Sequence, residues 1–395
     1  MPWSEAYRYI SGPIELRIIE PQAMNDLPET ILQFGAGNFL RSFADTFVDE
    51  ANRAGQNVGS VVVVQSTESR RAELINAQKG RYHVAVRGLV DGQPVDEVQV
   101  VESIGRALVA NTQWEQVLEA GCGADLKWII SNTTEKGYLL AENDGPDDAP
   151  PRAFPPKLLT VLLHRFRSGG SPVTIIPCEL FDRNADMLCE ILHKLAKEWK
   201  LEAAFVTWLV EGCAWVNNLV DRIVTTAPDD HRLRSKDALL TVAEPFCLWV
   251  LEKKPGATYI LDHPAIRIEE DVRSYYLRKV RILNGLHSAL VEKAVPQGIE
   301  TVREAVEHPE IGTWLEQLLY EEIVPTLQDQ VDAPAEFAQQ TLERFKNPFI
   351  EHRLEAIALH HESKVKVRLI PTYVEFSAKF GRPPSLLSDL LKEFI

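Results

Sequence analysis

The chain has 395 residues, more than the ~250–300 residues that one hydrophobic core usually holds, so two domains are expected. It is 45% hydrophobic and 25% charged, which is ordinary for a soluble globular protein and excludes a disordered or fibrous one. The net charge of −15 disfavours nucleic acid and membrane surfaces as partners. No apolar run would span a bilayer and the first residues do not resemble a signal peptide, so a cytoplasmic location is expected.

Short apolar runs alternate with amphipathic segments through the first half of the chain, a pattern typical of β-α units around a parallel sheet. Strands are expected at residues 31–34, 61–65, 128–132, 173–178 and 205–210. Amphipathic helices are expected at 38–55, 69–78, 157–166 and 184–199, and a hairpin at 81–88 and 96–103. After residue 256 the strand signal fades. We therefore predict an α/β fold with a Rossmann-type N-terminal domain at 1–262 and a mostly α-helical C-terminal domain at 263–395.

The segment FGAGNFLR, residues 34–41, follows the first expected strand and opens the first expected helix. Glycine at position 35 allows a tight turn, and glycine at 37 lets the backbone approach a pyrophosphate at the helix N-terminus, where unpaired N–H groups favour anions. Leu40 replaces the third glycine of GxGxxG, so a turn that uses glycine only for its geometry stays open. The candidate cofactor-binding residues are Phe34, Gly35, Ala36, Gly37, Asn38 and Phe39.

Two further strand ends supply candidate cofactor contacts. One strand ends at Gln65 and Ser66, where a NAD enzyme often carries an acid for the ribose hydroxyls. This tip has no carboxylate and is followed by arginines at 70 and 71, so we expect NAD while NADP stays open. Asn132 and Thr133 leave another strand at its carboxyl end, where open α/β sheets bind ligands. A simple Asn/Thr turn is an equal alternative there.

The segment RKVRILNGLHS, residues 278–288, places Lys279, Asn284 and His287 in an expected amphipathic helix. On an α-helix His287 lies about 80° and Asn284 about 140° from Lys279, so the three share one side. A dehydrogenase without zinc needs a base for the alcohol proton and donors for the developing alkoxide, and these residue types supply both. No spacing typical of a metal site is present, so no metal is expected. A buried histidine and a surface lysine are the alternatives.

Four motifs occur in a fixed order: FGAGNFLR, SNTTEKGY at 131–138, NNLVDRIV at 217–224 and KVRILNGLH at 279–287. This set resembles the polyol-specific long-chain dehydrogenase/reductase (mannitol dehydrogenase) family over residues 31–370. The resemblance implies a Rossmann-type domain, a helical domain, a cleft between them and metal-independent chemistry. It also implies Lys279 as general acid/base, Asn284 and His287 as ligands of the reacting oxygen, and Asp221 as a partner of a substrate hydroxyl. A salt bridge to Arg222 or a loop cap is the alternative for Asp221.

Within the family, VVVVQST, PCELFDRN at 177–184 and RFKNPFIEH at 344–352 are most similar to the tagaturonate reductase branch. A sugar acid needs a cation for its carboxylate, and Lys364 and Arg368 are the candidates, with His352 and Arg344 nearby in sequence. A charged helix face is the alternative. An unperturbed lysine is a poor base at neutral pH, but burial beside the cationic nicotinamide would lower the pKa of Lys279.

The predicted function is NAD(P)-dependent, metal-independent hydride transfer between nicotinamide and a sugar acid of the tagaturonate/altronate type. Mannitol 2-dehydrogenase, fructuronate reductase and mannitol-1-phosphate 5-dehydrogenase activities are the enzyme alternatives, since a phosphate also requires clustered cations. A cofactor-binding regulator without catalysis is the alternative from another class. The expected partner is a small sugar acid or polyol, with neither nucleic acid nor membrane, and the sequence gives no indication of the oligomeric state.

Overall fold

The computed structural model describes residues 27–90, 93–133, 135–141 and 144–395, and the chain forms two compact units. Unit 1 comprises the residues up to Val86 together with Glu97–Val272. Unit 2 comprises Arg87–Asp96 and Arg273–Ile395, so the chain enters it twice. A division into separate domains after residue 262 stays a prediction.

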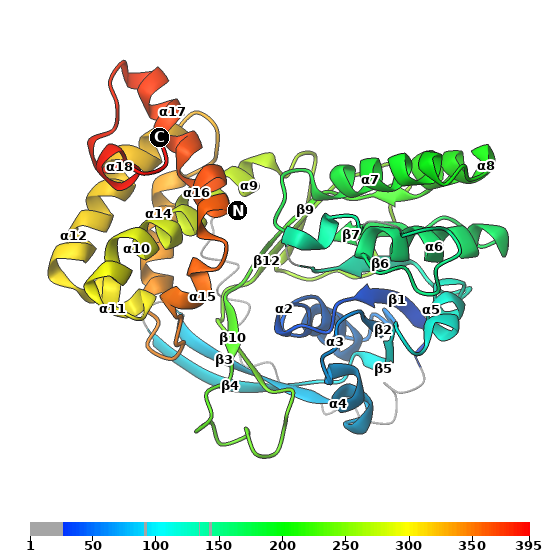
Figure 1. Ribbon diagram of the computed structural model, residues 1–395. Coiled ribbons are helices and arrows are strands. Elements are labelled where there is room, and N and C mark those ends of the chain that lie inside the picture. The colour runs from blue at the N-terminus through cyan, green and yellow to red at the C-terminus, as the bar shows by residue number, and fades with distance from the viewer. Residues whose placement is uncertain (1–26, 91–92, 134, 142–143) are drawn as a thin grey trace. The chain divides into compact units, whose positions relative to one another are not determined.

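A six-stranded parallel sheet organises unit 1 (Figure 1). Its order is β5-β2-β1-β6-β7-β8, and every neighbouring pair is parallel. The strands are β1 (Glu29–Phe34), β2 (Ser60–Gln65), β5 (Ile104–Val109), β6 (Trp128–Ser131), β7 (Thr174–Pro177) and β8 (Ala214–Trp215). Numbered along the chain, these six strands have the order 3-2-1-4-5-6 of dinucleotide-binding sheets. The predicted Rossmann-type fold is confirmed.

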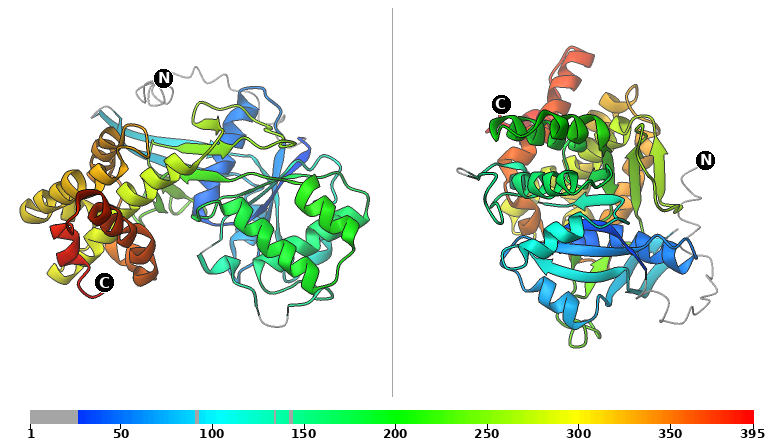
Figure 2. Two further views of the ribbon diagram at one scale, coloured as in Figure 1. Left: turned by 90° about the horizontal axis from the view of Figure 1, so that it is seen from above. Right: turned by 90° about the vertical axis from the view of Figure 1, so that its right-hand side faces the viewer.

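Helices cover both faces of this sheet, which is why β1 and β2 are almost continuously buried. Ile31 and Val63 face one apolar core, and Leu32 and Val62 face the other. α6 and α7 lie side by side on the second face (Figure 2). The helices are α3 (Ala44–Arg53) and α4 (Arg71–Ala77) on the first face, and α5 (Trp114–Gly121), α6 (Phe154–Arg167) and α7 (Asn184–Glu198) on the second.

Seven strands form two smaller sheets, with the orders β10-β11-β3-β4 and β13-β12-β9. The neighbours β3 and β4 form the hairpin that the sequence predicts. The strands are β3 (Tyr82–Val90), β4 (Gln93–Val101), β9 (Asn218–Asp221), β10 (Val224–Thr226), β11 (Thr241–Ala243), β12 (Leu248–Glu252) and β13 (Ile266–Glu269).

The expected strand at residues 205–210 is wrong, because these residues are helical. They belong to α8 (Ala203–Thr207) and the π-helical turn η3 (Trp208–Gly212). Phe205 and Leu209 are fully buried, and their spacing of four places both on one side of a helix. An apolar run of six residues does not distinguish a buried strand from such a helix. The edge strand β5 was also missed.

Unit 2 is mostly helical beyond residue 272, as predicted. α10 packs against α12, α15 and α16, and Leu286, Ala289 and Leu290 on it are fully buried. Across the described residues no helix is long and apolar enough to cross a membrane. The helices are α9 (Arg273–Arg278), η4 (Lys279–Asn284), α10 (Gly285–Ala294), η5 (Val295–Gln297), α11 (Val302–Glu307), α12 (Pro309–Gln317), η6 (Leu318–Ile323), α13 (Val324–Leu327), α14 (Pro334–Phe345), α15 (Leu354–Ala358), α16 (His361–Arg368), α17 (Ile370–Phe380) and α18 (Ser385–Leu390).

The hairpin residues of unit 2 are held by the loop that follows α14. The side-chain amide of Asn347 donates to the carbonyl oxygen of Arg87 at 3.0 Å. The Arg87 guanidinium lies over the ring of Phe349, 5.2 Å from its centroid. These contacts explain why the chain enters unit 2 twice.

Candidate functional site

The turn between β1 and α2 (Asn38–Arg41) lies at the carboxyl end of a central strand. Gly35 has a φ of +127°, which side chains rarely adopt, and an added Cβ would lie 3.0 Å from the carbonyl oxygen of Asn132. Gly37 precedes α2 with an ordinary φ of −68°. A Cβ there would meet no atom of the described residues within 4 Å. The turn therefore requires glycine at 35, whereas Gly37 leaves open space beside the start of the helix.

The ends of β1 and β6 meet at this turn. The backbone N–H of Asn132 donates to the carbonyl of Phe34 at 3.1 Å, and its side-chain amide donates to Cys178 at 2.8 Å. β1 and β6 are neighbours in the sheet but its first and fourth strands in chain order, and the strand order reverses between them. Open α/β sheets bind ligands outside the carboxyl ends of the strands at this switch point. The geometry fits a dinucleotide whose pyrophosphate lies against the backbone of the turn.

Several predicted cofactor residues serve the protein core with their side chains. Phe34 and Ala36 are buried, and the ring of Phe39 stacks on Phe43 with centroids 5.0 Å apart. Asn38 accepts a hydrogen bond from Arg41 at 2.8 Å. These positions therefore offer a ligand mainly their backbone groups.

Two buried polar side chains hold the glycine turn from the protein side. The Gln33 amide donates to the carbonyl of Gly35 at 3.1 Å. The Arg41 guanidinium donates to the carbonyl of Ala36 at 3.4 Å in addition to its bond to Asn38. Sequence reasoning missed both residues. The available signals were a polar residue inside an apolar strand and an arginine that ends the glycine motif.

Gln65 shapes its own loop. Its side-chain amide donates to the carbonyls of Thr67, at 2.8 Å, and Ser69, and its side-chain oxygen accepts from the N–H of Ala72 at 2.7 Å. Ser66, partly exposed at the strand tip, stays a candidate for direct contact with a ribose.

A buried carboxylate organises the end of β6. Glu179 accepts from the Ser131 hydroxyl at 3.1 Å, and from the N–H and hydroxyl of Thr133 at 2.9 and 3.1 Å. The Tyr138 hydroxyl, in the 3-10 turn η2 (Glu135–Tyr138), donates to it at 3.1 Å. Burial raises the pKa of Glu179. This carboxyl group therefore fixes the loop that carries Asn132 and Thr133.

In unit 2, Lys279 and Asn284 are the first and last residues of the π-helical segment η4, and His287 lies in α10. The expectation of a regular α-helix is wrong here. Hydrogen bonds in a π-helix join residues five apart, so its turn is wider than that of an α-helix. Lys279 and Asn284 are five residues apart. On the wider turn, the angle about the helix axis between their side chains is therefore smaller than on an α-helix. Short π-helical segments are frequent at functional sites.

All three of these side chains are buried, with exposed fractions of 6% for Lys279, 7% for Asn284 and 5% for His287. The His287 ring stacks on Phe345 with centroids 4.3 Å apart, and its edge meets His352 at 4.7 Å. No described residue hydrogen-bonds the Nε2 atom of His287. A buried polar atom without a partner is rare, and it marks a place where a ligand oxygen can bind.

Positive charge gathers around this imidazole. Burial lowers the pKa of His287 well below its ordinary value, and His352, Arg368, Arg344 and Lys279 lower it further. Burial and the charge of Arg344 lower the pKa of His352 to about 4. Both imidazoles are therefore neutral at pH 7. The cationic side chains that act on His287 are Arg344, Arg368 and Lys279. Arg344 and His352, which the sequence places beside the predicted cations Lys364 and Arg368, thus both act on this imidazole.

The predicted cations on α16 have different surroundings. Arg368 donates to the hydroxyl of Ser288 at 3.3 Å, one residue after His287. Lys364 donates to the carbonyl of Ile357 at 2.9 Å, and its charge acts on His361. His361 is partly buried, and its Nε2 atom lies 2.7 Å from a Glu292 carboxylate oxygen.

Asp221 ends β9 in unit 1 and is 2% exposed. Within the described parts of the chain, no three His, Cys, Asp or Glu side chains are placed to hold a metal ion together.

Two family profiles match the chain in succession. The mannitol dehydrogenase Rossmann domain matches residues 29–260, and the mannitol dehydrogenase C-terminal domain matches residues 271–390. Altronate oxidoreductase of Bacillus subtilis (strain 168) is 39% identical over 374 residues, which cover 91% of this chain and 78% of that protein. Altronate oxidoreductase of Halalkalibacterium halodurans is 37% identical over 383 residues, which cover 92% of this chain and 74% of that protein.

Among solved structures, mannitol 2-dehydrogenase of Pseudomonas fluorescens, in a ternary complex with NAD and D-mannitol, has a similar fold. Its TM-score is 0.80 at 22% identity, over 93% of this chain and 78% of that one. At 22% identity this similarity shows a common fold alone.

Proposed function

Because the chain belongs to the mannitol dehydrogenase family and is a nicotinamide-dependent oxidoreductase of sugar acids or polyols, we propose that it interconverts a keto sugar acid and its alcohol, tagaturonate and altronate. The names of the relatives at 39% and 37% identity support this substrate pair. The reaction we propose is metal-independent, with Lys279 as the general acid/base.

The gathering of cations around a neutral imidazole is the observation that carries the choice of a sugar acid. Arg344, Arg368 and Lys279 all act on buried His287 in a protein of net charge −15. These positive charges attract an anionic substrate, whereas a neutral polyol gains no charge-assisted hydrogen bond from them. We propose Arg368 and Arg344 as the ligands of the carboxylate, with His352 beside them. Lys364 is proposed for a distal hydroxyl.

Lys279 is proposed to move the proton of the reacting oxygen. Bound nicotinamide would supply or accept the hydride. When the ketone is reduced, the Lys279 ammonium donates a proton to the new alkoxide; when the alcohol is oxidised, the neutral amine takes that proton. The neutral state of His287 supports this division of work, because an imidazole of low pKa does not compete as the acid at neutral pH.

Asn284 and His287 are proposed to hold the reacting oxygen. A donor in a buried, preorganised site stabilises charge as it forms on that oxygen. The unpartnered Nε2 of His287 supports this role among the described residues. Asp221 is proposed to accept a hydrogen bond from a substrate hydroxyl.

NAD is the proposed cofactor, with the backbone of residues 34–39 at its pyrophosphate, Ser66 at its ribose, and Asn132 and Thr133 near the nicotinamide. No acid stands at the tip of β2, and Arg70 is exposed and paired with Glu73 at 2.9 Å. Replacing Arg70 and Arg71 by alanine and comparing the Michaelis constants of NADH and NADPH tests this choice. A selective loss of NADPH affinity would show that the two arginines contribute to cofactor choice.

A substrate panel tests the proposed function. Tagaturonate, fructuronate, fructose and fructose 6-phosphate are each offered with NADH or NADPH, and oxidation of the cofactor is followed by absorbance. We expect the highest kcat/KM for tagaturonate with NADH. Preference for fructose or fructose 6-phosphate would contradict the sugar acid, and cofactor binding without turnover on any substrate would contradict the enzyme.

The Arg344→Gln variant tests whether Arg344 binds the carboxylate of the substrate. Its KM for tagaturonate should rise about tenfold or more with little change for fructose, since a charge-assisted hydrogen bond contributes about 1.5–3 kcal/mol. Arg303→Gln is the matched control, because Arg303 is an exposed arginine of the same unit, paired with Glu307. Equal effects on both substrates would argue against a carboxylate ligand.

A further inference from the structure

Behind the glycine turn lies a carboxyl group that no step above uses. Asp45, in the first turn of α3, is 0% exposed. The Gln33 amide that holds the Gly35 carbonyl also donates to Asp45 Oδ2 at 3.2 Å. One amide group thus joins the turn to this buried acid.

Two buried oxygen atoms at this site have no hydrogen-bond donor among the described residues. No described residue donates to Asp45 Oδ1, and the side-chain oxygen of Gln33 also has no partner. The Gln33 amide cannot rotate to correct this, because its N–H groups are needed by the carbonyl of Gly35. Two buried acceptors without donors are costly when one belongs to an ionised carboxylate.

Tyr82 offers a place for the missing proton. Its hydroxyl donates its one proton to the carbonyl oxygen of Arg41 at 2.6 Å, so only its lone pairs are left for an interaction with Asp45. A carboxylic acid at Asp45 could donate to this oxygen, whereas a carboxylate would face it without a proton between them. Burial raises the pKa of Asp45 to about 7, against the opposing effects of Gln33, Arg41 and Tyr82.

Arg41 connects the ionisation of Asp45 to the turn. Its guanidinium donates to Ala36 and Asn38, and its charge acts on Asp45. An ionised Asp45 would attract this guanidinium away from the turn. A neutral Asp45 leaves it there.

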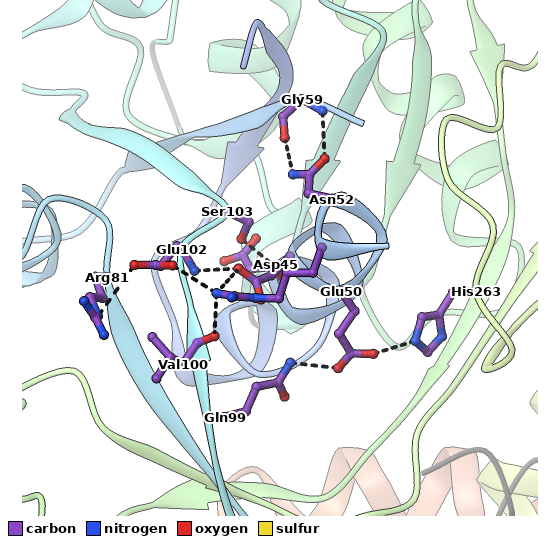
Figure 3. Close-up of polar contacts among 12 residues, drawn as sticks. Asp45, Glu50, Asn52, Gly59, Arg81, Gln99, Val100, Glu102, Ser103 and His263 are labelled. Atoms are coloured by element: carbon purple, nitrogen blue, oxygen red, sulfur yellow. Dashed lines mark hydrogen bonds and ion pairs between the residues drawn. The ribbon is translucent and has the colours of Figure 1, made fainter. Parts of the chain in front are cut away.

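Three other charged side chains, Asp237, Arg71 and Asp49, act electrostatically on the residues around Asp45. Asp237 acts on both Arg41 and Tyr82, and Arg71 acts on Arg41. Asp49, one helical turn after Asp45, acts on Tyr82. Figure 3 shows the surroundings of α3, where the Ser103 hydroxyl donates to the backbone carbonyl of Asp45 at 2.7 Å. That bond uses the main chain and leaves the carboxyl group unsatisfied.

We propose that Asp45 works in its protonated form and, through Gln33, Tyr82 and Arg41, positions the glycine turn that receives the dinucleotide. Asp45 is a positioning residue, since it touches the turn only through these neighbours. The inference rests on the proposed function, because it takes the turn as the cofactor site. It makes cofactor affinity depend on pH even though Asp45 does not contact the ligand.

The test measures the Kd of NADH for the full-length protein from pH 6 to 8.5. For the wild type, Kd should rise about tenfold between pH 6.5 and 8, because only the fraction with neutral Asp45 binds well. In Asp45→Asn, whose amide is neutral and can donate a proton, Kd should match the wild-type value at pH 6.5 and stay within about twofold across the range. Asp45→Ala, which cannot donate, should bind weakly at every pH.

Asp49→Asn is the matched control. Asp49 is an equally buried acid of α3, but it is fully engaged: Arg53 donates to it at 2.6 Å and the N–H of Glu102 at 2.8 Å. This variant should keep the wild-type pH profile of Kd. Infrared spectra of the cofactor-free protein at pH 6.5 give a second readout, since a protonated carboxyl band should disappear in Asp45→Asn and persist in Asp49→Asn.

The outcomes separate the two proposals. A wild-type pH profile in Asp45→Asn, or an infrared spectrum without a band that this substitution removes, overturns the role of Asp45. Failure of the wild type to bind NADH at any pH overturns the proposed cofactor site, and the infrared band then still decides whether Asp45 holds the proton.

Discussion

The imidazole of His287 stacks on the phenyl ring of Phe345, with centroids 4.3 Å apart and ring planes 20° apart. Phe345 ends α14 and is 2% exposed, so this ring fixes the orientation of a histidine that lies in another helix. If His287 holds the reacting oxygen, its orientation is part of the catalytic geometry.

Phe345→Leu should therefore lower kcat more than it lowers cofactor affinity. The leucine keeps an apolar contact but not the flat surface, and small misplacements in an active site can cost about 100-fold in rate. Stopped-flow turnover and NADH titration measure the two effects. Phe376→Leu, at a buried phenylalanine of α17, is the control for lost stability. Equal losses of kcat in both variants would contradict the proposal that Phe345 orients His287.

Lys279→Met should abolish most turnover while retaining NADH affinity. Methionine fills the buried space of the lysine chain but cannot transfer a proton, and general acid–base catalysis contributes about 10²–10⁴-fold. Turnover with tagaturonate is compared with NADH binding. Lys366→Met, at an exposed lysine of α16 paired with Glu362, controls for the loss of a positive charge. Near-normal activity of Lys279→Met would exclude this lysine as the acid.

His352 should make the protein less stable as the pH falls. Its pKa is lowered from 6.5 to about 4 by burial and Arg344. Below pH 6.5 the unfolded chain binds a proton at this residue that the folded protein refuses, so the free energy of unfolding decreases by at most about 3 kcal/mol down to pH 4. His352→Gln should show a smaller decrease in urea unfolding over this range. An unchanged slope would contradict the buried neutral state, and His360→Gln, at an exposed histidine, is the control.

Gly35→Ala should lower the stability of the protein, whereas Gly37→Ala should lower its affinity for NADH. The first places a Cβ at a φ of +127° and 3.0 Å from the Asn132 carbonyl, so it should destabilise the protein by about 1–3 kcal/mol. The second meets open space at an ordinary φ, so the melting temperature should stay close to that of the wild type while NADH affinity falls. Thermal melts with and without NADH check both. Unchanged NADH affinity in Gly37→Ala would contradict the approach of the pyrophosphate to this position.

The glycine turn and the parallel strands were predictable because their signals are local. FGAGNFLR follows an apolar strand and opens an amphipathic helix, and burial on both faces gives β2 a continuous apolar run and β1 an apolar run interrupted by Gln33. Residues 205–210 show the limit of the same reasoning, since a short apolar run fits a strand and a helix equally well.

The environment of the site was not predictable in the same way. The π-helical form of η4 leaves no mark in hydrophobic spacing, so Lys279 and Asn284 were assigned α-helical angles. The neighbours of His287 come from α14 and the following loop, distant in sequence, and contacts of that kind depend on packing. Asp45 lies within the helix expected at residues 38–55, and no motif in the sequence marks it. Only its burial against Gln33 and Tyr82 distinguishes it.

Asp45→Asn should stabilise the protein at pH 8 relative to the wild type, and much less at pH 4. The pKa of Asp45 is raised from 3.8 to about 7 by burial. Between these values the unfolded chain loses its proton while the folded protein keeps it, so the wild type loses at most about 4 kcal/mol as the pH rises to 7 and no more above it. Asparagine does not titrate, so the stability difference between the two proteins should grow from pH 4 to 7 and then level off. Urea unfolding at pH 4.5, 6, 7 and 8 measures it, with Asp125→Asn as an exposed control. A difference independent of pH would mean that Asp45 is already ionised in the folded protein at low pH.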